Sequence, residues 1–152
     1  MQIEAALGVT EQRKPTILVG VSGSHASAAA LRWAEDEAER RHGELKIVRI
    51  WQSERRASYA RQPALADRPA GPERASQELA EAVQAALGPG PLPDTTTVVV
   101  EGQAERELVA ESAGADLLVL GSGSRTSIGP VVRTCLSHAH CPVVVVSLPI
   151  GA

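Results

Sequence analysis

The chain alternates between short apolar runs and longer segments in which apolar residues recur at helical spacing. The runs are rich in β-branched and aliphatic side chains and span Thr16–Val21, Leu45–Trp51, Thr95–Glu101, Leu117–Leu120 and Val143–Val146. Runs of this length predict strands, and the uninterrupted ones are typical of strands buried on both faces of a parallel sheet. The pattern therefore predicts five strands.

The segments between these strands predict four helices. Ser24 is suited to cap the first, and Gly43 and Gly88 are suited to end the first two. Pro130 fits the first turn of the last helix, where its missing N–H has no intrahelical partner, and Pro142 ends that helix. The predicted helices run from His25 to about Arg41, over Glu73–Leu87, over Gln103–Ala113, and for about ten residues from the neighbourhood of Pro130.

Strands that alternate with helices are typical of an open, doubly wound α/β sheet with helices on both faces. Because crossovers are right-handed, a chain that winds outward from its first strand and then reverses has the strand order 3-2-1-4-5. The switch point then lies between strands one and four, where the turns Ser22–Ser24 and Gly121–Ser124 face one crevice. We predict a single domain over residues 15–149, preceded by a loose arm over residues 1–14.

The composition narrows the choice of partners. Fifteen basic and eighteen acidic residues give a net charge of −3, which is the wrong sign for a general nucleic-acid or anionic-membrane binder. The first fourteen residues lack the apolar core of a signal peptide, and no run reaches the length of a membrane span. These features predict a cytoplasmic protein whose partners are small molecules or proteins.

Several segments contain residue types that can form disulfides, metal sites or interaction surfaces, but the sequence does not complete such a site. Cys135 and Cys141 would lie about 9 Å apart along a helix, too far for a disulfide, and are predicted to be free thiols. His138 and His140 point to different faces of a helix and lack further ligands, so no metal site is predicted. No catalytic residue is predicted. The arginine- and proline-rich segment 53–72 indicates a surface loop, with an interaction arm as the alternative, and its role does not follow from the sequence.

Three stretches, taken together, resemble the universal stress protein family. They are ILVGVSGSHASAAALRWA from Ile17, the run from Gly102 that contains ADLLVLGS, and the closing CPVVVV from Cys141. The resemblance implies the α/β topology described above and a homodimer. In the order 3-2-1-4-5, the apolar segment 143–148 is an exposed edge, so we expect the dimer to form through it.

The resemblance also implies an ATP site, from which this chain departs. In the nucleotide-binding branch of the family, a G-x-x-G turn is followed after nine residues by a glycine and a small hydroxyl residue. Gly121 matches the first glycine, whereas the second falls on Ser124, next to Gly123, and the third falls on Thr134, followed by Cys135. Side chains at these places would crowd phosphates, and a positive φ at Ser124 would cost roughly 1–2 kcal/mol.

Other positions of the implied site lie on the strands and the last helix. Ser22 replaces an acidic residue near the ribose and adenine, and Ile50 takes the place of an apolar side chain that packs on the base. The serines of the turn and Arg125 offer compensating donors to a phosphate. The predicted nucleotide-binding residues are Gly20, Val21, Ser22, Ile50, Leu120, Gly121, Ser122, Gly123, Ser124, Arg125, Thr134, Cys135, Leu136 and Ser137.

Two function classes follow from the sequence. The first is a regulatory module that binds ATP or another adenine nucleotide in the crevice between strands one and four. The second is a dimeric stress-response interaction protein whose crevice has lost its ligand. The turn contains no Walker-type lysine and no paired acid and base, so we expect a bound nucleotide to be held rather than turned over.

Overall fold

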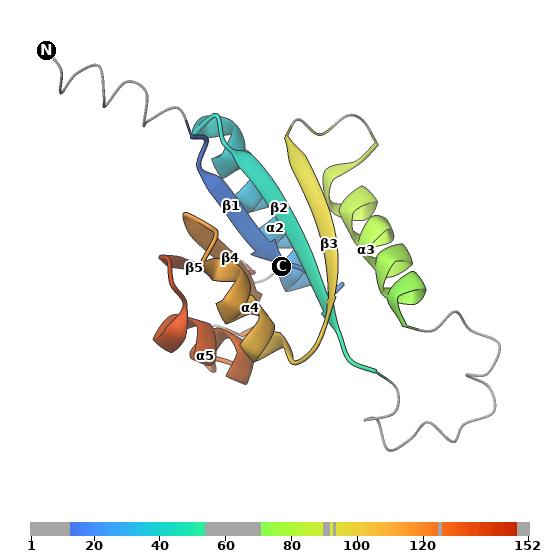
Figure 1. Ribbon diagram of the computed structural model, residues 1–152, viewed down its shortest axis with the longest axis vertical. Coiled ribbons are helices and arrows are strands. Elements are labelled where there is room, and N and C mark those ends of the chain that lie inside the picture. The colour runs from blue at the N-terminus through green and yellow to red at the C-terminus, as the bar shows by residue number, and fades with distance from the viewer. Residues whose placement is uncertain (1–12, 54–70, 90–91, 93, 125, 149–152) are drawn as a thin grey trace, which may run out of the picture.

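The computed structural model describes residues 13–53, 71–89, 92, 94–124 and 126–148. Its strands form one parallel sheet in the order β3-β2-β1-β4-β5 (Figure 1). This order confirms the predicted open α/β fold. The elements in chain order are β1 (Thr16–Gly20), α2 (His25–Arg40), β2 (Glu44–Trp51), α3 (Pro72–Leu87), β3 (Thr95–Glu101), α4 (Ala104–Ser112), β4 (Leu117–Ser122), α5 (Pro130–His138) and β5 (Val143–Ser147).

Helices cover both faces of the sheet, as the sequence predicted. On one face Ile17 and Val19 of β1 pack with buried residues of α2 and α3. On the other face Leu18 packs with buried residues of α4 and α5, such as Leu108 and Val132. Because successive side chains of a strand point to opposite faces, a central strand between two helical layers must be apolar throughout. This requirement explains the continuous apolar runs at the centre of the sheet.

The two ends of α2 differ in how well the sequence predicted them. Ser24 is the N-cap, as expected, and its Oγ accepts a hydrogen bond of 3.1 Å from the Ser27 N–H. At the other end His42, rather than Gly43, takes the positive φ, 53°. Gly43 has a steric role, because a Cβ there would lie 2.4 Å from the carbonyl oxygen of Pro15. The expectation that Gly43 itself adopts the capping conformation is therefore wrong.

Ion pairs fix the start of β1 at the amino-terminal edge of the sheet. One carboxylate oxygen of Asp116 accepts a 2.8 Å hydrogen bond from Arg13, and the other accepts a 2.7 Å bond from the Thr16 N–H. The hydrogen bond from Arg13 and that from Thr16 hold the pKa of Asp116 below its ordinary value. Lys14 pairs with Asp94. Arg13 and Lys14, the last two residues of the predicted arm, thus form ion pairs with the domain. The rest of that arm lies outside the described residues.

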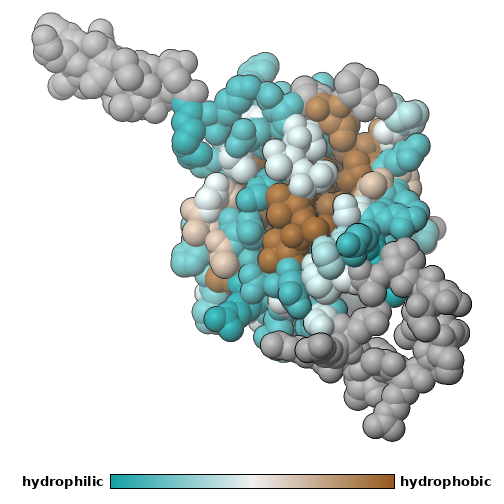
Figure 2. Space-filling model, turned by 45° about the vertical axis from the view of Figure 1, so that its right-hand side comes forward, coloured by the Kyte–Doolittle hydropathy of each residue, from teal (hydrophilic) through white to brown (hydrophobic). Residues whose placement is uncertain are grey.

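The exposed surface combines a hydrophilic majority with local apolar areas. Figure 2 shows hydrophobic residues gathered in the middle of one face and surrounded by hydrophilic ones. All five residues of the edge strand β5 are half-buried. None of the helices within the described ranges is long and apolar enough to cross a membrane. Most of the arginine-rich segment, residues 54–70, lies outside the described residues.

Candidate functional site

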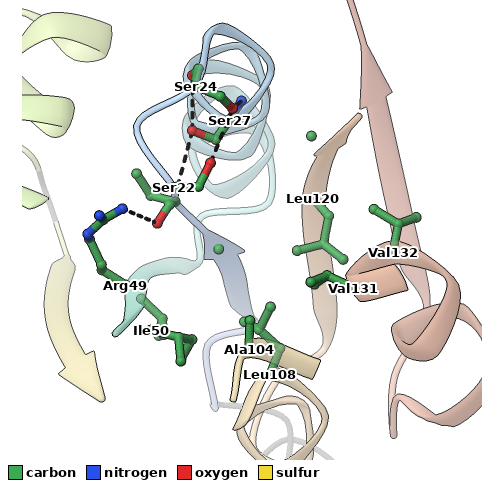
Figure 3. A pocket seen from close by; sticks show the side chains of 14 residues that line it. Ser22, Ser24, Ser27, Arg49, Ile50, Ala104, Leu108, Leu120, Val131 and Val132 are labelled. Carbon is green, nitrogen blue, oxygen red and sulfur yellow. Dashed lines mark hydrogen bonds between the residues drawn. The ribbon is translucent and has the colours of Figure 1, made fainter. Parts of the chain in front are cut away.

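A cavity of about 360 Å³ opens at the carboxyl ends of β1 and β4, the predicted switch point of the sheet (Figure 3). Its volume is within the range of about 300–1,000 Å³ that is usual for small-molecule sites. The lining comes from strands β1, β2 and β4, the β1–α2 turn with the first turn of α2, and the amino-terminal halves of α4 and α5. These residues are Gly20, Val21, Ser22, Ser24, Ser27, Val48, Arg49, Ile50, Ala104, Leu108, Leu120, Gly121, Val131 and Val132.

One wall of the cavity is polar and is built by the β1–α2 turn. The Oγ of Ser27 accepts hydrogen bonds of 3.2 Å from the N–H groups of Ser22 and Gly23, and it donates to the Ser24 carbonyl oxygen. The Ser22 hydroxyl donates to the Oγ of Ser24 at 3.2 Å. Gly23 has a φ of 91°, which explains why a residue without a Cβ occupies the turn. The turn therefore presents hydroxyl groups whose positions are fixed by hydrogen bonds within the turn.

The opposite wall is apolar. Figure 3 shows Leu120 of β4 and the valines Val131 and Val132 of α5 on this side, with Ala104 and Leu108 of α4 below them. The first turn of a helix carries N–H groups that have no intrahelical partner. Since Val131 and Val132 lie in the first turn of α5, the amino-terminal end of that helix borders the cavity. The site thus combines an apolar surface with a helix terminus that favours anions.

Arg49 enters the polar side of the cavity from β2. Its Nη2 donates to a carboxylate oxygen of Glu78 at 2.9 Å, and its Nη1 lies 3.5 Å from the carbonyl oxygen of Val21. The Nε atom is buried and has no hydrogen-bond partner. Arg49 also lines a neighbouring hollow of about 320 Å³, together with Ser22, Gly23, Glu78, Glu81 and Ala82. The guanidinium therefore separates the two spaces.

Six of the predicted site residues line the cavity: Gly20, Val21, Ser22, Ile50, Leu120 and Gly121. Gly121 is at the first glycine position of the family motif, and here it has a packing role as well. A Cβ on Gly121 would lie 2.3 Å from the carbonyl oxygen of Ala26. The glycine thus allows the end of β4 to lie against the first turn of α2, which brings the two walls of the cavity together.

The β4–α5 turn does not behave as the motif predicted. Ser122 is buried and its hydroxyl donates to the Ser124 carbonyl oxygen at 2.8 Å. The Oγ of Ser124 accepts hydrogen bonds from the N–H groups of Thr126 and Ser127. Ser124 is not among the residues with positive φ, so the expected backbone strain at this position is wrong. Ser122, Gly123 and Ser124 do not line the cavity, and Arg125 lies outside the described residues.

The residues predicted on α5 are displaced from the cavity along the helix. Thr134 lies in the second turn of α5, so the nine-residue spacing does not lead to the helix start. The residue that precedes the first turn is Gly129, with Pro130 directly after it. Gly129, and not Thr134, is therefore the residue at the amino-terminal end of α5, where a helix terminus favours an anion, and Thr134 does not line the cavity. Leu136 and Ser137 follow Thr134 and are also absent from the lining.

Cys135 packs inside the protein rather than in the cavity. Its side chain is fully buried in the cluster between the sheet, α4 and α5. Burial raises the pKa of the Cys135 thiol, with a smaller contribution from Glu105, and burial also raises that of Cys141. Both cysteines are free thiols, as predicted. A buried thiol with a raised pKa points to a structural role for Cys135.

Sequence reasoning missed eight lining residues. Three of them left a usable signal. Arg49 is a cation in an otherwise apolar half of a strand, and Val131 and Val132 directly follow the Gly129–Pro130 pair that marks a helix start. The missed residues are Ser24, Ser27, Val48, Arg49, Ala104, Leu108, Val131 and Val132.

Metal ligands do not gather at this site or elsewhere in the part of the chain that the structure describes. No group of three or more histidine, cysteine, aspartate or glutamate residues among the described residues is placed to hold a metal ion. His138 instead lies in the last turn of α5, with its Nδ1 3.3 Å from the Thr134 carbonyl oxygen.

Comparisons with known proteins identify the family. The profile of the universal stress protein family matches residues 15–147. Universal stress protein Rv2623 of Mycobacterium tuberculosis strain H37Rv is 37% identical over 134 residues, which are 85% of this chain and 44% of that protein. Rv2624c of the same strain is 34% identical over 91% of this chain and 50% of that protein. This chain thus spans about half the length of these relatives.

Solved structures show the same fold. The universal stress protein from Archaeoglobus fulgidus has a TM-score of 0.66 at 20% identity, over 92% of this chain and 98% of that chain. A universal stress protein solved in complex with cAMP has a TM-score of 0.61 at 23% identity, over 89% of this chain and 98% of that chain. Together with the profile and the sequence relatives, these similarities show that the chain belongs to the universal stress protein family.

Proposed function

We propose that this chain is a regulatory module that binds an adenine nucleotide in the cavity at the carboxyl ends of β1 and β4. The observation that carries the proposal is the convergence of three features on one cavity: an apolar wall, a hydroxyl-rich turn and the first turn of α5. Ligands of open α/β sheets bind at such switch points. An adenine nucleotide has a planar aromatic base, whose faces pack on apolar side chains, and an anionic end, which suit the two parts of the site.

The proposed orientation follows from the chemistry of the walls. The base packs between Ile50 and Leu108, on the apolar side. The 5′-phosphates lie toward Gly121 and the amino-terminal end of α5, where the helix dipole and the free N–H groups stabilise negative charge. The ribose then lies beside Ser22, next to the polar wall.

Nucleotide complexes of structural relatives support this choice of ligand class. One relative is described in complex with cAMP, one from Archaeoglobus fulgidus in complex with dAMP, and one from Arabidopsis thaliana with AMP bound. The shared fold provides the same switch point, and the ligand class is carried over to this chain as part of the proposal. The calorimetric titration described below determines which of AMP, cAMP, ADP and ATP the chain binds.

We infer that the module holds its nucleotide without turning it over. Among the described lining residues, Arg49 is the charged side chain, and none is a lysine, histidine or carboxylate. Phosphoryl transfer depends on groups that position the nucleophile and neutralise the phosphates. The proposed role is therefore a change of state on nucleotide binding, read out by a partner.

Calorimetric titration tests the proposal. Purified protein, checked first for co-purified nucleotide, is titrated with AMP, ADP, ATP and cAMP. Ala104 is half-buried and lines the cavity, so Ala104→Trp should fill the site and weaken binding at least tenfold, on the order of 1.4 kcal/mol. Ala110 is exposed on the same helix, and Ala110→Trp is the matched control. Absence of binding to all four nucleotides, or equal binding by both variants, would contradict the proposal.

A second candidate function is a dimeric interaction protein whose cavity has no nucleotide. The half-buried valines of the edge strand β5 favour this candidate, because an apolar strand edge invites pairing with a second copy. Dimerisation is compatible with both functions, so the nucleotide titration separates them.

A further inference from the structure

We propose that Arg49 makes the cavity selective for adenine nucleotides that carry a phosphate on the 2′ or 3′ hydroxyl of the ribose. This inference rests on the proposed function, because it names the ligand class of the same site. Its basis is the polar side of the cavity, beside which we place the ribose and where Arg49 is the charged group among the described lining residues.

The polar wall of the cavity would be the partner of the ribose. A carboxylate is the usual acceptor for free ribose hydroxyls in dinucleotide sites, whereas an arginine accommodates a phosphate on the ribose. Ser22 lies in the turn directly after β1, and none of the described lining residues is a carboxylate. The guanidinium of Arg49 lies within 3.5 Å of the carbonyl oxygen of Val21, the residue before Ser22. The polar wall therefore offers a cation to the sugar.

Arg49 has N–H donors that its protein contacts do not use. A guanidinium carries five N–H donors in a fixed plane. One bond to Glu78 and one long contact to Val21 hold the group, and the Nε atom is buried without a partner. Because the Nε atom is enclosed by protein, the donors that can reach a ligand are the remaining N–H groups of the two terminal nitrogens. Glu78 thus fixes the orientation of the guanidinium and leaves donors available for a ligand.

The charged group of Arg49 also favours a phosphate. Glu78 accepts hydrogen bonds from both Arg49 and Arg74, at 2.9 and 3.3 Å, so two cations share this carboxylate. Glu81 lines the neighbouring hollow and not the cavity itself. Of these residues only Arg49 lines the cavity, so the charged group that the described lining presents to a ligand is a guanidinium. A phosphate is better matched to this charge and to a planar guanidinium than a neutral hydroxyl is.

Titration with three isomeric ligands tests the inference. Adenosine 2′,5′-bisphosphate, adenosine 3′,5′-bisphosphate and ADP carry the same two phosphates and differ in where the second is attached. We expect at least one of the two bisphosphates to bind the wild-type chain about tenfold more tightly than ADP does, the size of one charge-assisted contact. The inference is overturned if ADP binds as tightly as both bisphosphates.

Matched variants assign the preference to Arg49. Arg49→Gln should reduce the preference to about twofold or less, and Arg49→Lys should keep part of it. Arg74→Gln removes the same charge at a residue outside the cavity and should keep the preference. A folded Arg49→Gln variant that keeps the tenfold preference would overturn the assignment. If that variant does not fold, the Arg49→Lys variant and the wild-type comparison decide the question.

The outcomes also distinguish the two proposals. If 5′-AMP and ADP bind but the bisphosphates show no preference, the proposed function stands and the role of Arg49 is wrong. If no adenine nucleotide binds the folded wild-type chain, the proposed function is wrong and the inference about Arg49 is overturned with it.

Discussion

Gly121 joins the two walls of the cavity through backbone packing. A Cβ at this position would lie 2.3 Å from the Ala26 carbonyl oxygen, and neither backbone can move away without separating β4 from α2. We expect Gly121→Ala to lower the free energy of unfolding by about 3 kcal/mol, as overpacking does in a close-packed interior. Urea denaturation measures this loss.

Gly114 provides the matched control for that measurement. A Cβ on Gly114 meets no atom within 4 Å, so Gly114→Ala should change the stability by less than about 1 kcal/mol. Equal effects of the two substitutions would show that the close approach at Gly121 has no energetic weight.

The thiol of Cys135 gives a second test at a single position. Full burial and a raised pKa both reduce the concentration of reactive thiolate at neutral pH. In a Cys141→Ser background, we expect Cys135 to react with a thiol reagent at least tenfold more slowly than a model peptide thiol. A rate at or above that of the peptide, in protein shown to be folded, would mean that Cys135 is accessible and reactive.

Single residues differ in how well the sequence predicted them. The N-cap Ser24 was predictable because capping depends on local hydrogen bonds between near neighbours. The conformation of Ser124 was not, because it depends on how its hydroxyl bonds to the following turn. The role of Arg49 depends on Glu78, which lies 29 positions away. Contacts between residues far apart in the chain depend on the three-dimensional fold and give little signal in the local sequence.

The start of β1 is held by Asp116, and this contact makes stability depend on pH. The pKa of Asp116 in the folded state is lowered from its ordinary value of 3.8, so the ionised carboxylate stabilises the fold above that pH. The stabilisation is lost as the pH falls through the folded-state pKa. We expect Asp116→Asn to cost about 1 kcal/mol at pH 7, since the pair is partly exposed, and to cost much less near pH 3.

Urea denaturation at the two pH values tests this dependence, with Asp36→Asn as a control on an exposed carboxylate of α2. The role of Asp116 is wrong if Asp116→Asn lowers the free energy of unfolding equally at both pH values. It is also wrong if the effect of Asp36→Asn falls with pH in the same way.

Strands and helices were more predictable than the turns that join them. Period and composition located every strand that the structure describes, and the Gly129–Pro130 pair marked the start of α5. The motif spacing places its third glycine on Thr134, in the second turn of α5, whereas the helix itself begins directly after Gly129. A helix terminus favours an anion through its geometry, so the position of such a terminus is read from the helix and not from a count of residues.

The edge strand β5 makes a prediction about the whole molecule. An apolar strand edge favours pairing with a second copy, and a lysine on such an edge opposes it. We expect light scattering to show a dimer at tens of micromolar, on the order of usual assay concentrations. Val145→Lys should shift the protein to a monomer. Thr97→Lys, at an exposed position of the opposite edge strand β3, should leave the dimer intact. A wild-type monomer at these concentrations would contradict the prediction.

The strand order of the molecule followed from general rules, whereas its ligand did not. Right-handed crossovers and one reversal of winding direction lead to β3-β2-β1-β4-β5 and place the crevice between β1 and β4. Six predicted residues indeed meet there. Seven others do not line the cavity, and Arg125 lies outside the described residues. These eight positions follow Gly121 in the chain, where the assignment depended on the family motif and not on the fold.

We propose above all that an adenine nucleotide occupies the cavity between the β1–α2 turn and the first turn of α5. Nuclear magnetic resonance of the isotope-labelled chain, titrated with 5′-AMP to about 1 mM, tests this claim most directly. We predict that the amide signals of Ser22, Gly121 and Val131 shift together and saturate, while those of β5 and the outer face of α3 remain in place. Shifts that concentrate away from the cavity, or no shifts at all, would contradict the account.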